Sequence, residues 1–171
     1  MRFEWFRKRK PETSHFQRLV REAQRQRESS DLSRRQQLID EANRQQLETQ
    51  DLPVVSLEDF FTGNEDVGSI GCNLSPVLGP RTFHETLRAI RARPDVQDVL
   101  IEIPDTSEND PDPFTWPFSD QVYILAGAPR EEVERWLAPL QPDEVEATCI
   151  NPRVLTVELK NGMKIYRAWW D

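Results

Sequence analysis

Apolar residues follow two different periods along this chain, and the change falls near residue 53. Between residues 14 and 28 they lie on one narrow helical face, made of Phe16, Leu19, Val20 and Ala23. Ser29 to Asp31 interrupts that face, so a second helix, capped by Asp31 or Ser33, is expected to run to about residue 47. Both stripes are too thin to stabilise an isolated helix, so we expect this arm to lie on another surface.

From residue 53 onward, the pattern predicts six elements in a β-α-β-β-α-β order. They are a strand at 67–74, a helix at 81–93, strands at 98–103 and 121–126, a helix at 129–137 and a strand at 145–149. This order is typical of the ferredoxin-like, split βαβ sheet of the α+β class. The strand at 121–126 is apolar on both sides, as a central strand requires, whereas Glu102, Glu144 and Glu146 mark the second and fourth strands as edges.

A C-terminal β-hairpin is expected to extend this sheet. Asn161-Gly162, a strong signal for a two-residue turn, separates the runs 153–159 and 163–170. One face of the hairpin is apolar, while the other carries Ile165 and Trp169 among polar residues. We expect this mixed face to receive either the arm or a partner.

Composition predicts a cytoplasmic protein. The chain has 171 residues, of which 37% are hydrophobic and 30% charged, with a mean hydropathy of −0.70. It has no apolar run of about eighteen residues, and its charged first ten residues are not followed by the apolar stretch of a secretory signal. Cys72 and Cys149 are therefore expected to be free thiols, buried as small core residues.

The net charge of −8 is unevenly distributed. Residues 1–52, the basic helical arm, hold twelve Lys and Arg against nine Asp and Glu, a balance of +3. Residues 53–171, the acidic α+β domain, hold ten basic against twenty-one acidic residues, a balance of −11. An acidic domain lacks the cations that bind a phosphate backbone, so no nucleic acid is expected on it, whereas a basic protein partner suits it.

Aromatic residues beside a run of carboxylates form the main candidate for recognition. Phe114, Trp116 and Phe118 follow the acidic stretch 102–112. They fit either a patch that recognises a protein partner or a satellite core folded over the sheet edge. The acidic stretch lacks the spacing of a calcium loop, so no metal site and no cofactor are expected.

A second candidate is the loop at 75–81, which ends at Arg81 where a helix begins and could hold a small anion. His84 lies in the first turn of that helix, with His15 as the other histidine of the chain. This set predicts a ligand-binding domain or a small enzyme. A third candidate is the N-terminus, where Phe3, Trp5 and Phe6 precede the basic run 7–10. This segment fits contact with an anionic membrane surface, and it fits equally a frayed terminus or a hydrophobic plug for another chain.

Several segments resemble a group of small bacterial proteins without an assigned activity. They are SLEDFF from Ser56, GSIGCN from Gly68, WPFSD from Trp116 and the closing AWWD from Ala168. The likeness covers about residues 54–171 and implies a bacterial, cytosolic origin.

The sequence therefore leaves two alternative functions. The first is a non-catalytic module whose acidic domain docks a protein partner, with the arm tethering it or associating with a second copy. The second is an enzyme or anion-binding domain using Arg81 and His84. A pocket converging on Arg81 and His84 favours the second, and an exposed aromatic patch at Trp116, Phe118 or Trp169 favours the first.

Overall fold

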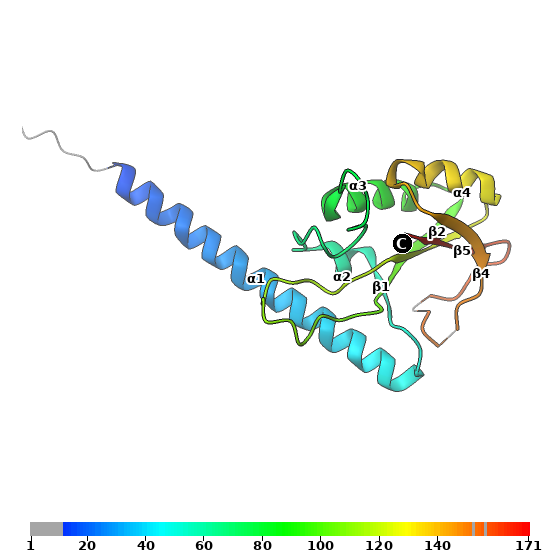
Figure 1. Cartoon of the computed structure of the whole chain (residues 1–171), viewed down its shortest axis with the longest axis horizontal. Coiled ribbons are helices and arrows are strands. Elements are labelled where there is room, and N and C mark those ends of the chain that lie inside the picture. The colour runs from blue at the N-terminus through cyan, green and yellow to red at the C-terminus, as the bar shows by residue number, and fades with distance from the viewer. Residues whose placement is uncertain (1–11, 152, 156) are drawn as a thin grey trace, which may run out of the picture.

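Figure 1 shows the computed structural model of the chain, which describes residues 12–151, 153–155 and 157–171, with side chains of the first helix from residue 17 onward. The predictions made for Phe3, Trp5, Phe6 and the basic run 7–10 lie outside these residues. The elements in chain order are α1 (Glu12–Thr49), β1 (Val54–Ser56), α2 (Leu57–Phe61), α3 (Gly79–Arg91), β2 (Val96–Glu102), β3 (Gln121–Ala126), α4 (Arg130–Leu137), the 3₁₀ turn η1 (Ala138–Leu140), β4 (Glu144–Thr148) and β5 (Lys164–Trp169). Among the described residues, no helix is long and apolar enough to cross a membrane.

The strands form one antiparallel sheet in the order β1-β2-β3-β5-β4. The α+β class and the central place of the strand at 121–126 are as predicted. The ferredoxin-like order is not the one observed: β2 lies inside the sheet, and its neighbour on the outer side is β1. The predicted first strand, at 67–74, consists instead of turns with one isolated bridge from Ile70 to Ser119.

Glycine explains why that segment is not a strand. Gly71 has a φ of +59°, and a Cβ placed there would lie 2.5 Å from Cζ of Phe83. The backbone turns here so that it can pass close to a buried aromatic ring, which only glycine permits.

The predicted hairpin is wrong in its first half. The Asn161-Gly162 turn forms, with the amide of Met163 donating to the carbonyl of Lys160 at 3.1 Å. However, β5 pairs with β3 on one side and β4 on the other, so no sheet position remains for residues 153–159. Val154, Leu155 and Val157 instead pack on the open face of the sheet, in the core that contains Leu125 and Ile165.

The sheet is therefore covered on both faces. Alternation along each strand sends one set of side chains under α2, α3 and α4, forming a core with Phe60, Phe83 and Leu87. The opposite set forms a smaller core beneath the segment after β4.

The arm is one continuous helix of 38 residues, not two. Ser29 to Asp31 does not break it, and Asp31 pairs with Arg27 one turn earlier at 3.7 Å. In its second half, Leu38, Ile39 and Ala42 are buried, and the helix lies along α2, β1 and the loops beside them. Its first half is exposed from residue 17 to residue 30 and extends away from the rest of the structure (Figure 1). The expectation that the arm lies on the face of Ile165 and Trp169 is therefore wrong.

Candidate functional site

A groove of about 550 Å³ opens where α1 leaves the domain, and we call it the junction groove. One wall is α1, and the other walls are the loops at 63–67 and 112–116. The α1 wall consists of Gln24, Arg27, Glu28, Asp31, Leu32 and Arg35, and the loop walls of Gly63, Glu65, Asp66, Val67, Asp112, Pro113, Phe114, Thr115 and Trp116.

Hydrogen bonds to the side chains of Arg35, which is buried, and Asp66, which is half-buried, hold the loop walls in place. Arg35 is 8% exposed and donates Nε to the carbonyl of Thr115 and Nη2 to the carbonyl of Ser107, the latter at 2.8 Å. Asp66 accepts from the amide of Trp116 at 2.9 Å through Oδ2 and from the amide of Gly68 at 2.8 Å through Oδ1. The groove is therefore fixed by side chains from both of its sides.

Close contact between α1 and the loop at 63–67 depends on Gly63. Its φ is +87°, and a Cβ there would lie 2.7 Å from Oδ1 of Asp31. Glycine thus allows the loop backbone to approach the helix at the end of the groove.

The charge of the groove is negative. Five carboxylates line it (Glu28, Asp31, Glu65, Asp66 and Asp112) against two guanidinium groups. Arg27 forms ion pairs with Glu65 and Asp31, and Arg35 donates hydrogen bonds to carbonyl groups of the loops. The excess of carboxylates favours a cation as the ligand.

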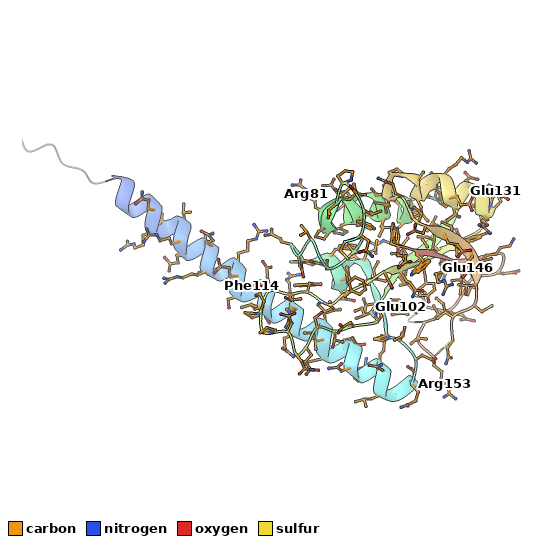
Figure 2. The ribbon with its side chains drawn as sticks, viewed as in Figure 1. Arg81, Glu102, Phe114, Glu131, Glu146 and Arg153 are labelled. Atoms are coloured by element: carbon orange, nitrogen blue, oxygen red, sulfur yellow. The ribbon has the colours of Figure 1, made fainter. Side chains whose placement is uncertain are left out.

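Exposed apolar side chains accompany these carboxylates. Phe114 is 55% exposed and Val67 is 61% exposed, and both line the groove. Phe114 lies beside the middle of α1 (Figure 2). An exposed ring beside carboxylates is suited to an aliphatic or aromatic side chain that carries or accompanies a positive charge.

The three aromatic candidates, Phe114, Trp116 and Phe118, differ in how far they are buried. Trp116 is 4% exposed and belongs to the main core, where its Nε1 has no hydrogen-bond partner. Phe118 is half-buried, and its amide donates to the carbonyl of Asp105 at 2.8 Å. Phe114 is the ring that faces solvent.

Ile165 and Trp169 lie away from the groove, on β5. Ile165 is 7% exposed and belongs to the smaller core. Trp169 is half-buried and lies opposite Gln121 and Glu144 in the sheet register. The structure therefore does not bring these two residues together with Phe114.

Arg81 and His84 have different surroundings. The Arg81 side chain is 91% exposed and donates to Glu85 at 3.0 Å (Figure 2). His84 stacks on Phe61, with ring centroids 5.0 Å apart, and its Nε2 is buried without a hydrogen-bond partner. Burial lowers the pKa of His84, which favours the neutral ring. The pair therefore does not converge on a shared ligand position.

Within the described residues, no group of three or more His, Cys, Asp and Glu side chains is placed to hold a metal ion. Cys72 and Cys149 are free, and both are exposed, so the prediction that they are buried is wrong. Cys72 is exposed because its segment is a surface turn, and Cys149 lies just beyond the end of β4.

Glu102 was expected to point outward from an edge strand, but it is 7% exposed. Because β1 covers the outer side of β2, Glu102 is enclosed and accepts a hydrogen bond of 2.6 Å from the hydroxyl of Tyr123. Burial raises the pKa of Glu102, and burial together with the Glu102 carboxylate raises the pKa of Tyr123. Arg167 lies on β5, opposite Tyr123, and forms an ion pair with Glu146. Glu102 and Glu146 are labelled in Figure 2.

Sequence patterns did not identify the α1 wall of the groove. Glu28, Asp31 and Arg35 look like ordinary polar residues of a solvated helix, and their role depends on loops far along the chain. The one available signal was the Gly63 position between polar residues, which is typical of a backbone turn.

Comparison with known proteins agrees with the expected resemblance to bacterial proteins without an assigned activity. A protein of Escherichia coli (strain K12), "Uncharacterized protein YfbO", is 40% identical over 121 residues, which cover 70% of this chain and 83% of that protein. No solved structure matches the chain. The family described as "Uncharacterized protein YfbO family" matches residues 33–168, a range that begins two residues before Arg35, the first buried residue among those from 17 onward in α1. The chain therefore belongs to the YfbO family.

Proposed function

We propose that this protein is a non-catalytic binding module whose junction groove docks a basic segment of a protein partner. The observation that carries the proposal is the exposed ring of Phe114 within a groove lined by five carboxylates. A flexible basic segment gains charge attraction from the carboxylates and apolar contact from the ring.

The position of the groove supports docking over catalysis. Its loop walls are held by the buried Arg35 and by Asp66, so the surface is formed before a partner arrives. A preformed surface binds with a smaller entropic cost than one that orders on binding. The same carboxylates repel a phosphate backbone, so a nucleic acid is a poor ligand for this groove.

A cytoplasmic location is part of the proposal. Two free, exposed cysteines are typical of a protein in a reducing compartment.

A synthetic peptide provides the test. The probe is a fluorescent decapeptide of arginine and leucine, and its control replaces each arginine with glutamine. We expect the arginine probe to bind the full-length protein in a titration of fluorescence anisotropy, and to bind more weakly as salt is raised, because exposed charges are screened.

Variants assign the binding to the groove. Phe114→Ser combined with Glu28→Gln is expected to weaken binding of the probe by about tenfold. The matched control is Val77→Ser combined with Glu134→Gln, which changes an exposed valine and a glutamate outside the groove. Equal binding of the glutamine probe, or equal losses in the two double variants, would contradict the proposal.

A further inference from the structure

The exposed half of α1 has a surface that its own domain leaves uncovered. Leu19 is 50% exposed and Val20 is 46% exposed, and Ala23 follows them on the same side of the helix. An isolated helix of about fifteen residues is marginal in water. Burial of this stripe against another helix would stabilise a segment that the domain does not contact.

The groove lies on the face of α1 that adjoins this stripe, on the side of Val20. Val20 is followed by Gln24, Arg27 and Asp31, at helical spacings of four, three and four residues, and these three residues line the groove. A helix packed along the stripe and running toward the domain would therefore end beside the groove.

We infer that two copies of this chain associate through the exposed halves of α1 in an antiparallel pair, and that each copy places its basic N-terminal run in the junction groove of the other. This inference rests on the proposed function, since the N-terminal run is the basic segment that the groove would receive.

The register follows from the stripe. In an antiparallel pair with Leu19 opposite Val20, the residue numbers of any two facing positions add up to 39. Phe16 is therefore opposite Ala23, and Glu12 is opposite Arg27. The chain that precedes Glu12 contains the basic run 7–10, which then reaches the next turn of the second copy. Glu28 and Asp31 lie on that turn, at the groove.

Charge distinguishes this arrangement from a parallel pair. In a parallel pair identical positions meet, so the two basic runs would lie together and repel one another. In the antiparallel pair each run meets a groove with an excess of carboxylates. The aromatic residues Trp5 and Phe6 come just before the basic run, and the groove offers the exposed ring of Phe114 to them.

Two-fold symmetry makes every contact occur twice. The stripe alone is short for a stable pair, but two occupied grooves add contacts at both ends of the paired helices. A substitution in either region therefore acts on the dimer dissociation constant through two copies of the same contact.

Sedimentation equilibrium of the full-length protein provides the test. We expect the wild-type chain to be a dimer at micromolar concentration. Leu19→Gln with Val20→Gln, which keeps good helix formers, is expected to raise the dissociation constant about 100-fold or more, because four apolar side chains are lost from the pair. Arg21→Gln with Arg25→Gln, on the opposite face of α1, is the matched control and is expected to leave the dimer intact.

A charge exchange tests the direction of the helices. Lys10→Glu is expected to weaken the dimer about tenfold, because two exposed ion pairs become repulsive. Adding Glu28→Lys to that variant is expected to restore the dimer. In a parallel pair, Glu12 of one copy and Glu28 of the other are already separated by about 24 Å of helix, and Lys10 precedes Glu12, so no recovery would occur.

Several outcomes would overturn the inference. They are a wild-type chain that stays monomeric through the micromolar range, a dimer that survives the Leu19 and Val20 substitutions, and a charge exchange without recovery. The proposed function is tested separately, because the monomeric Leu19→Gln, Val20→Gln variant has an open groove and should bind the arginine probe more tightly than the wild type. Probe binding by a wild-type chain that is monomeric would leave the proposed function in place and remove the self-association.

Discussion

The side-chain amide of Gln45 forms two hydrogen bonds with the backbone of Val54, as a neighbouring strand would. Its Nε2 donates to the carbonyl of Val54 at 3.1 Å, and its Oε1 accepts from the amide of Val54 at 2.8 Å. Val54 begins β1, an edge strand of the sheet. Gln45 therefore satisfies backbone groups at a sheet edge and fixes the second half of α1 against it.

Gln45→Ala is expected to lower the free energy of unfolding by about 1–3 kcal/mol, because buried backbone groups of Val54 lose their partners. The measurement is urea denaturation followed by circular dichroism. Gln46→Ala, at an exposed position of the same helix, is the matched control and should cost little. An equal loss in both variants would mean that the edge does not depend on this amide.

Glu102 is expected to make stability fall as pH rises above the ordinary range of a glutamate. Burial raises the pKa of Glu102 in the folded protein, so the folded state holds its proton at a pH where the unfolded state has released it. This contribution to stability is complete below the unfolded pKa and is lost as pH rises through the folded pKa. Glu102→Gln should therefore show a smaller fall in unfolding free energy from pH 4 to pH 8 than the wild type.

The control for that comparison is Glu144→Gln, at an exposed position on β4, which should retain the wild-type slope. Tyr123→Phe supplies a second check, because it removes the hydrogen bond that favours the charged carboxylate. It is expected to cost about 1 kcal/mol and to steepen the fall with pH. A wild-type slope in Glu102→Gln would contradict the assignment.

Glu58 is expected to have the opposite effect at low pH. Its carboxylate accepts hydrogen bonds from Arg91, one of them at 2.7 Å, and these bonds lower the pKa of Glu58 to about 2. The pair links α2 to α3, and its contribution is present above the ordinary glutamate pKa and is lost as pH falls toward 2. NMR titration of the Glu58 carboxyl group checks the pKa directly.

Glu58→Gln should flatten the acid side of the stability profile, measured by urea denaturation between pH 2 and pH 5. Glu85→Gln, an exposed glutamate on α3, serves as the comparison. The same flattening in both variants would assign the effect to overall charge and not to the Arg91 pair.

Arg35→Met is expected to loosen the loop wall of the junction groove, because the carbonyls of Ser107 and Thr115 lose a charged donor. The expected cost is about 1.5–3 kcal/mol. Hydrogen exchange followed by mass spectrometry should show faster exchange across residues 105–118, and the arginine probe should bind less tightly. Arg34→Met, at an exposed position one residue earlier, is the control. Unchanged exchange in Arg35→Met would show that the loop is held by other contacts.

Gly71→Ala is expected to destabilise the protein by about 2–4 kcal/mol, because a positive φ and contact with the Phe83 ring both oppose a side chain. Gly162→Ala separates the two causes. Its φ is +84°, but a Cβ there meets nothing within 4 Å, so it should cost only about 1 kcal/mol. Thermal unfolding compares them, and similar shifts in Tm would contradict the close approach to Phe83.

Local patterns identified most of the regular elements. Phe83, Leu87 and Ile90 gave the helical period of α3, and all three are buried as predicted. The unbroken apolar run of β3 predicted a central strand, because only a strand covered on both faces can bury every side chain. The Asn161-Gly162 turn was also identified, since its signal lies within two residues.

Patterns failed where the outcome depended on contacts between distant segments. Glu102 marked β2 as an edge, but the short strand β1 pairs with it and encloses the carboxyl group. Ser29 to Asp31 indicated a helix break, but α1 continues, and Asp31 lies close to the backbone of Gly63. Among the residues that line the junction groove, Phe114 and Trp116 were candidates from the sequence, while the carboxylates and Arg35 of α1 were not.

The sequence by itself determined the helical character of the arm, most of the helices and strands of the domain, and the opposition between a basic N-terminal part and an acidic remainder. These properties are set by residue period and composition, which are local and additive. Only the tertiary structure decided the sheet order, the packing of Val154, Leu155 and Val157 on the open face, and the meeting of α1 with the loops at 63–67 and 112–116. Those outcomes depend on which distant surfaces pack together. The period of apolar residues shows that a segment has an apolar face, but it does not show which other segment covers that face, because any partner of similar shape would require the same period.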